Sequence, residues 1–238
     1  MALDEALMRR AARTGDAVFR VYGWSRPTLS LGRNQRARGC YDLERARALD
    51  ISFVRRPTGG RALLHHKEVT YSATLPVSDA SAALDAYDFI NEVLLEGLAA
   101  LGVGVARAEG GVAVPPGLRP CFDVPAEREL VIGDRKLVGS AQWRHEDALL
   151  QHGSILVRDD QALINQLLKD PLPEVPGAAT LADALGFEPD TVEVAESLRR
   201  ALTNRTGHPI SHFKTDDIAA ETADLKQAYL DDAWTWRR

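Results

Sequence analysis

The sequence predicts an α+β fold, with a mixed and largely antiparallel sheet and flanking helices. Short runs of β-type residues dominate the first two thirds of the 238-residue chain, and helical spacing dominates the last third. Single strands do not alternate with long helices, so a doubly wound nucleotide-binding fold is not expected. At this length we expect one domain over residues 1–238, with a helical C-terminal segment from about residue 160.

The expected elements follow from the spacing of apolar residues and from turn and cap signals. The expected strands are Val18–Gly23, Thr28–Leu31, Ile51–Arg55, Ala62–His65, Glu68–Leu75, a segment opened by Lys136, and Leu149–Val157. The expected helices are Leu3–Ala12, Asp42–Leu49 with Asp42 as its cap, Ser78–Leu101, Asp160–Leu168, Leu181–Leu185, Val192–Leu202 and Thr215–Leu230. Ala108–Pro120 is rich in Gly and Pro and predicts a surface loop. The two tryptophans of the tail DDAWTWRR are expected to pack back onto the domain.

Composition excludes several classes of function. A net charge of −5 does not suggest nucleic-acid binding, and no apolar run approaches the length of a membrane span. The two cysteines stand at unrelated positions, which gives no disulfide framework and makes the cytoplasm the expected compartment. No set of His, Cys and Asp has the spacing of metal ligands, so no metal is expected.

The chemistry of the chain is expected to lie between Pro120 and Val157. Cys121 follows the Gly/Pro-rich loop, and Lys136 opens a strand fifteen residues later. A cysteine is a nucleophile as its thiolate, which a nearby ammonium stabilises. The alternatives are a small buried cysteine and an exposed lysine at a strand end. Cys40 has no comparable neighbours and is interpreted as structural.

A second motif, RRPTGGRALLHH, spans Arg55 to His66. Two adjacent glycines after a strand allow backbone amides to approach an oxygen-rich ligand closely. A hairpin turn with solvated arginines is an equally good interpretation. No Lys-Ser/Thr pair follows the glycines, so this is not a Walker A loop. His65 and His152 are candidate general bases, although a lone histidine in a strand is more often a hydrogen-bonded packing residue.

These motifs resemble those of the lipoate–protein ligase, lipoyl(octanoyl) transferase and biotin–protein ligase superfamily. RRPTGGRALLHH is similar to its RRxxGGGxVxHD signature, KLVGSAQ with the later HGS is similar to its KIxGSAQ segment, and MALDEAL is similar to its first helix. The resemblance runs from Met1 to about Leu168. Within the superfamily, CFDVPAERELVIGDRKLVGSAQ is most similar to the cysteine-dependent octanoyltransferases of the LipM type.

The resemblance implies a fold, a reaction and its partners. The fold is that of the biotin/lipoate protein ligase catalytic domain. Octanoate moves from octanoyl-acyl carrier protein, through a thioester on Cys121, to a lysine of the glycine cleavage H protein or another lipoyl domain. Lys136 lowers the pKa of the thiol and contacts the acyl carbonyl, and no ATP or other cofactor is needed. The expected substrate-binding residues are Arg55, Arg56, Gly59, Gly60, Arg61, His65, Tyr71, Gly139, Ser140 and His152.

Two surfaces complete this expectation. An apolar slot for the acyl chain is expected from Leu63, Val69, Tyr71, Ala73 and Val138. Steering of acidic carrier proteins is expected from Arg33, Arg36, Arg38, Arg55, Arg56 and Arg61.

Two other functions remain open from the sequence. The first is an ATP-dependent lipoate–protein ligase in which Lys136 holds a lipoyl-adenylate. The second is a non-catalytic protein that binds lipoyl or acyl groups. Three departures from the family pattern bear on the choice: the chain begins inside the first helix, Arg61 replaces the third glycine, and His66 replaces the acidic residue.

Overall fold

The computed structural model describes residues 1–110, 117–118, 121–122, 127–173 and 176–238. The described strands are β1 (Val18–Tyr22), β2 (Thr28–Leu31), β3 (Ser52–Arg55), β4 (Leu63–His65), β5 (Glu68–Pro76), β6 (Ala106–Arg107), β7 (Leu130–Ile132), β8 (Arg135–His145) and β9 (Ala148–Leu156). The described helices are α1 (Ala2–Thr14), α2 (Leu43–Ala48), α3 (Ala80–Ala100), α4 (Ala162–Leu167), α5 (Leu181–Leu185), α6 (Thr191–Thr206), α7 (Ala219–Leu230), α8 (Asp232–Thr235) and a 3₁₀ turn at Thr215–Ile218.

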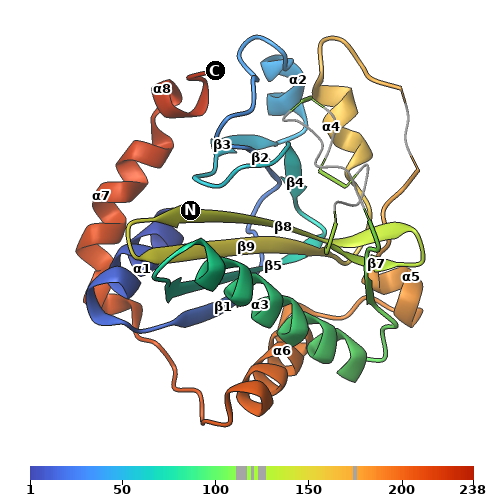
Figure 1. Cartoon of the computed structure of the whole chain (residues 1–238). Coiled ribbons are helices and arrows are strands. Elements are labelled where there is room, and N and C mark those ends of the chain that lie inside the picture. The colour runs from blue at the N-terminus through green and yellow to red at the C-terminus, as the bar shows by residue number, and fades with distance from the viewer. Residues whose placement is uncertain (111–116, 119–120, 123–126, 174–175) are drawn as a thin grey trace.

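The strands form two sheets (Figure 1). The larger sheet has the order β1–β5–β9–β8–β7–β6, and its neighbours pair antiparallel. The smaller sheet has the order β3–β2–β4, in which β2 runs parallel to β3 and antiparallel to β4. The mixed, largely antiparallel arrangement expected from the sequence is therefore confirmed.

One face of the larger sheet carries the main hydrophobic core. Helices α3 and α6 cover it, and α3 lies across β5 and β9 in Figure 1. Leu94 and Leu98 of α3 are fully buried there with Leu198 of α6. The 21-residue α3 is capped by Asp79, whose carboxylate accepts the Ala82 amide.

The other face of the larger sheet is shared by α1 and the smaller sheet. Met8 and Ala11 of α1 pack on Ala148 and Leu150 of β9. The smaller sheet builds a second core with α2 and α4, in which Leu29, Leu64 and other apolar residues are buried. The two sheets therefore leave their polar strand residues facing one another, and the functional site lies in this space.

The C-terminal tail packs against the smaller sheet, as its two tryptophans predict. The indole of Trp234 donates to the Arg55 carbonyl at 2.8 Å, and the Trp236 ring lies 5.0 Å from that of Phe53. Arg55 in turn donates through Nε to the Thr235 carbonyl at 2.9 Å. These contacts join the last helix to β3.

Sequence and structure agree on every expected helix and strand to within a few residues. Asp42 caps α2 as expected, accepting the amides of Glu44 and Arg45. The short elements β6, β7 and α8 were not among the expected ones, because two to four residues carry too little periodicity to be recognised. Most of the expected Ala108–Pro120 loop lies outside the described residues.

Candidate active site

The turn that follows β3 is shaped from inside by a buried cation. The guanidinium of Arg56 donates to the carbonyls of Gly59 (2.8 Å), Arg61 (2.7 Å) and Ser30 (3.0 Å). Gly60 has a φ of +91°, a left-handed conformation that strongly favours glycine. Within the described part of the chain, the amides of both glycines donate to no protein acceptor. The turn therefore keeps two N–H groups available beside the site.

Gly32 on the preceding loop makes close contact with this turn. A β-carbon on Gly32 would lie 2.0 Å from the Gly60 carbonyl oxygen, and only a backbone shift could relieve that overlap. We expect Gly32→Ala to lower the free energy of unfolding by about 1–3 kcal/mol. Thermal melting checks this, with a midpoint reduced by several degrees. Gly59→Ala is the matched control, since its β-carbon would meet nothing within 4 Å; equal midpoints for the two variants would contradict the prediction.

Cys121 and Lys136 meet at the start of β8. The Lys136 ammonium lies 3.6 Å from the Cys121 Sγ and donates to the Cys121 carbonyl at 3.0 Å. The Cys121 amide donates to the Ala62 carbonyl at 2.9 Å, which ties the cysteine to the approach to β4. The Phe122 ring covers the ammonium at 5.2 Å. A thiol and an amine from different elements thus share one partly enclosed space.

Lys136 also forms a buried ion pair. Its side chain is 2% exposed, and its Nζ lies 2.6 Å from the Glu129 Oε1. Glu129 directly precedes β7, which pairs with β8 across an irregularity between Leu130 and Val131. This irregularity shifts the register of the two strands near Lys136. The Lys136 ammonium therefore contacts a carboxylate on one side and the Cys121 thiol on the other.

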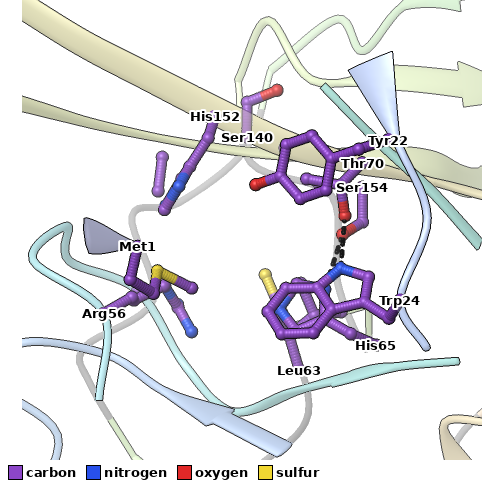
Figure 2. A pocket seen from close by; sticks show the side chains of 15 residues that line it. Met1, Tyr22, Trp24, Arg56, Leu63, His65, Thr70, Ser140, His152 and Ser154 are labelled. Atoms are coloured by element: carbon purple, nitrogen blue, oxygen red, sulfur yellow. Dashed lines mark hydrogen bonds between the residues drawn. The ribbon is translucent and has the colours of Figure 1, made fainter. Parts of the chain in front are cut away.

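A pocket opens between the two sheets and includes Cys121 in its wall (Figure 2). Tyr22, Trp24 and His152 point toward its centre. The Trp24 indole donates to Thr70 Oγ1 at 2.8 Å and its ring stacks on His65 with centroids 4.2 Å apart. With its open mouth included, the hollow has an empty volume of about 410 Å³. Its lining is Met1, Tyr22, Trp24, Arg56, Gly60, Leu63, His65, Thr70, Cys121, Gly139, Ser140, Ala141, His152, Gly153 and Ser154.

His152 lies in this pocket as a neutral imidazole. Burial lowers the pKa of His152 to about 3, and the nearby Asp4 carboxylate only partly opposes that effect. Its Nε2 lies 2.6 Å from the Thr58 hydroxyl, so the ring is fixed against the turn. Burial also acts to raise the pKa of Asp4, but the N-terminal ammonium and Arg20 outweigh it and lower that pKa to about 2.

We expect the protein to lose stability in acid through His152. The pKa of His152 is lower in the folded protein than its usual 6.5, so the unfolded chain binds more protons between pH 6.5 and about 3. Folding stability should fall as pH drops through this window, by about 2 kcal/mol at pH 5. Urea unfolding at pH 7 and pH 5 measures the loss. His152→Gln should show a smaller pH dependence, and an unchanged dependence in that variant would contradict the assignment.

Comparison with known proteins places this geometry in a family. Residues 1–203 match the model of the lipoyl protein ligase A/B catalytic domain. The octanoyltransferase LipM of Kyrpidia tusciae is 37% identical, over all of this chain and 94% of that protein. The octanoyltransferase LipM of Anoxybacillus flavithermus is 40% identical, over all of this chain and 93% of that protein. The chain belongs to the LipM octanoyltransferase family.

Solved structures support the same fold for this octanoyltransferase family member. Lipoate-protein ligase A bound with ATP aligns with a TM-score of 0.80 at 21% identity, over 99% of this chain and 92% of that one. Protein Ta0514 of T. acidophilum with bound lipoic acid aligns with a TM-score of 0.81 at 22% identity, over 99% and 92%. The biotin/lipoate protein ligase fold expected from the motifs is confirmed.

In this LipM-type chain, most of the expected substrate-binding residues line the pocket. They are Arg56, Gly60, His65, Gly139, Ser140 and His152. Both nitrogens of His65 are occupied, by Glu68 at 3.0 Å and by Ser30 at 2.9 Å, which fits a packing role. The carboxylate beside His66, which replaces the family's acidic residue, is that of Asp160, 2.8 Å from the His66 Nδ1.

Other expected residues of the octanoyltransferase site lie away from the pocket. Arg55 is fully buried and donates to the carbonyls of Gly32 (2.6 Å) and Gln35 (2.8 Å). Burial, followed by repulsion from neighbouring arginines, lowers the pKa of Arg55 to about 10. Arg61 is 6% exposed, and neither Arg61 nor Gly59 of the turn lines the hollow. The expectation that Arg55, Arg56 and Arg61 steer partners is wrong, because all three side chains are buried.

The expected acyl slot is also corrected. Leu63 lines the pocket, but Val69, Tyr71, Ala73 and Val138 lie in the core beneath α3 and α6. Side chains alternate along a strand, and on β5 it is Thr70 that faces the pocket. The Tyr71 hydroxyl nevertheless reaches the Ser140 hydroxyl at 2.7 Å. Tyr71 thus supports a pocket residue from the opposite face of the sheet.

Sequence reasoning missed three parts of the site. Glu129 lies in a run of charged residues that is typical of a surface turn, and nothing in that pattern marks it as buried. Tyr22 ends β1 and Trp24 lies in the turn after it. Two aromatic residues this close to a turn were the only sequence feature that could have indicated a ligand pocket there.

The structure describes no helix long and apolar enough to cross a membrane and, among its described residues, no group of three or more potential metal ligands.

Proposed function

We propose that Cys121 of this octanoyltransferase carries the octanoyl group as a thioester and passes it to the lysine of a lipoyl domain. The observation that carries the proposal is the 3.6 Å separation of Lys136 Nζ from the Sγ of Cys121, a residue that lines the pocket. A thiolate beside a buried ammonium is a suitable nucleophile for an acyl group that is already activated. Both the donor and the product of the first step are thioesters, so no ATP is required.

In the first half-reaction the Cys121 sulfur attacks the carbonyl carbon of octanoyl-phosphopantetheine on acyl carrier protein. A carbon–sulfur bond forms to Cys121 and the bond to the carrier sulfur breaks. The proton of the Cys121 thiol ends on the released carrier thiol. Lys136 is close enough to the sulfur to stabilise the negative charge that moves onto the carbonyl oxygen. The amides of Gly59 and Gly60, which donate to no acceptor among the residues that the structure describes, are further candidates for that role.

In the second half-reaction a neutral lysine amine of the acceptor attacks the Cys121 thioester. A carbon–nitrogen bond forms, the bond to Cys121 breaks, and one amine proton passes to the departing sulfur. The enzyme returns to its starting state and the product is an octanoyl amide. The His152 side chain is not the base in this scheme, because its low pKa makes it a poor proton acceptor.

The pocket supplies the site for the eight-carbon chain. Tyr22, Trp24 and Leu63 provide apolar surface in its lining. Each methylene that is buried contributes about 0.8 kcal/mol of binding free energy. Small-molecule sites typically combine apolar surface of this kind with polar groups that fix the orientation of the ligand, here those of Thr70, Ser140 and Ser154.

The protein partners are best matched by an arginine surface beside the turn. Arg33, Arg36 and Arg38 form no ion pair within the described part of the chain, and Arg36 and Arg38 are exposed. The tail joins them, since Arg237 donates to the Arg33 carbonyl at 2.6 Å. Arg33 also donates to the Pro57 carbonyl, which brings this surface next to the active-site turn. Acidic carriers and lipoyl domains are the partners that such a surface attracts.

Reversing charge on this surface should weaken partner association without changing the chemistry. We expect Arg36→Glu/Arg38→Glu to raise KM for octanoyl-acyl carrier protein about tenfold at low salt while kcat changes little. The difference in KM between the variant and the wild-type protein should shrink in about 0.5 M salt, because salt at that concentration screens attraction between exposed charges. Arg200→Glu on the exposed face of α6 is the control. A salt-independent effect, or the same effect for the control, would contradict the partner surface.

The test of the reaction uses the full chain without nucleotide. Wild-type protein is mixed with octanoyl-acyl carrier protein and glycine cleavage H protein, and intact masses are followed. The proposal expects an octanoyl adduct on Cys121, then its transfer to the H protein. If the H protein is modified only when free octanoate or lipoate and ATP are supplied, the protein is instead an ATP-dependent ligase. An adduct that forms but never discharges would support a non-catalytic acyl-binding protein.

A further inference from the structure

Glu129 is the carboxylate that contacts the Lys136 ammonium in the described part of the chain. The two charged atoms lie 2.6 Å apart, and the side chains of Lys136 and Glu129 are 2% and 9% exposed. A buried ammonium loses its proton readily unless an anion is close. The ammonium form of Lys136 therefore depends on an anion beside it at each stage of the reaction.

The charge beside Lys136 changes during catalysis. During acylation, the Cys121 sulfur 3.6 Å away bears negative charge as it attacks the donor, and that charge can balance the ammonium. Once Cys121 carries an acyl group, its sulfur is neutral and no longer contributes negative charge. At that stage Glu129 is the remaining anion in contact with Lys136 among the described residues.

We propose that Glu129 is a positioning residue that keeps Lys136 protonated and aimed at Cys121 while the acyl group is attached. This inference rests on the proposed thioester reaction. The ammonium is needed at this stage because the acceptor amine adds to the thioester carbonyl, negative charge builds on that oxygen, and the electron pair of the broken bond leaves on the Cys121 sulfur. The amine proton then moves to that sulfur, so Glu129 itself takes and gives no proton. Loss of the Glu129 charge should therefore slow discharge of the acyl-enzyme more than its formation.

Glu129→Gln tests this directly, because the amide keeps the shape and a hydrogen-bond acceptor but not the charge. Acyl-enzyme formation and its discharge onto the H protein are timed separately by intact mass. We expect discharge to fall about tenfold or more while formation changes by less than about threefold. Glu127→Gln, an exposed glutamate two residues earlier, is the matched control. Equal losses in both half-reactions overturn the proposal.

A second comparison separates charge from structure. Arginine keeps its proton without a nearby carboxylate, so Glu129→Gln should cost much less in a Lys136→Arg background than in the Lys136 background. A merely structural role predicts the same loss in both backgrounds and overturns the proposal. Glu129→Asp keeps the charge on a shorter side chain and should discharge within about threefold of wild type. That variant also tests the proposal if Glu129→Gln does not fold, since a loss of about tenfold or more would contradict it.

The outcomes distinguish this inference from the reaction beneath it. If wild-type protein forms no adduct on Cys121, the proposed function has failed. If the adduct forms and discharges normally in both wild type and Glu129→Gln, the function stands and the role of Glu129 is refuted.

Discussion

Cys121→Ala is expected to abolish octanoyl transfer, with a loss of about 10³-fold or more. The alanine side chain keeps the β-carbon but removes the sulfur that we propose forms the thioester, so no acyl-enzyme should accumulate. Because Cys121 is only partly buried and packs at the edge of a small cluster, the fold should tolerate the change. Single-turnover transfer from octanoyl-acyl carrier protein to the H protein, read by intact mass, measures the effect.

Two further variants sharpen this result. Cys121→Ser replaces sulfur with a hydroxyl that the same ammonium cannot make comparably nucleophilic, so its transfer should remain near the alanine level. Cys40→Ala is the matched control, since Cys40 is the other free cysteine and its Sγ contacts the Arg38 carbonyl at 3.7 Å. Transfer by Cys121→Ala at the wild-type rate would contradict the covalent mechanism. An adduct on Cys40 would move the nucleophile to the other cysteine.

The fold was predictable because its signals are local. Periodicity and caps delimit α3 and α2, and the KLVGSAQ and HGS segments predict the β8–β9 hairpin before any pairing is known. The division into two sheets was not predictable in this way. It depends on pairing β2 with both β3 and β4, and no feature within these short strands selects their partners.

The site was predictable where a motif names a residue, and much less so where burial decides. Cys121 and Lys136, which the motifs name, lie 3.6 Å apart at Sγ and Nζ, and their roles stay a prediction. The error over Tyr71 arose on β5, a strand buried on both faces, where alternation identifies residues that share a face but not which face meets the pocket. Arg55 was misread because charged side chains are rarely buried, and only the carbonyls of distant loops make that burial favourable.

The burial of Glu129, like that of Arg55, could not be predicted from the sequence. A glutamate before a short strand is normally a solvated residue, and nothing in AERELVI marks it as the partner of Lys136. Two long-range events bring them together: β7 pairs with β8, and the pairing is irregular between Leu130 and Val131. The buried ion pair of Lys136 and Glu129 could therefore be recognised only from the tertiary structure.

Lys136→Met is expected to reduce transfer by about 10²–10³-fold, because it removes the cation that the proposed reaction uses to stabilise negative charge on the sulfur and on the developing oxyanion. The methionine fills nearly the same volume, so the pocket should keep its shape. Stability should fall as well, by up to about 3–5 kcal/mol, since the buried Glu129 carboxylate loses the cation 2.6 Å away. Transfer assays and urea unfolding measure the two effects separately.

Pairing this change with one at Glu129 distinguishes catalysis from folding. In Lys136→Met/Glu129→Gln neither charge remains, so much of the lost stability should return while transfer stays low. Lys67→Met is the control, since Lys67 is an exposed lysine on the turn before β5. If the double variant regained transfer together with stability, the ammonium would be serving the fold alone. Recovery of stability without activity instead assigns the Lys136 charge to the reaction at Cys121.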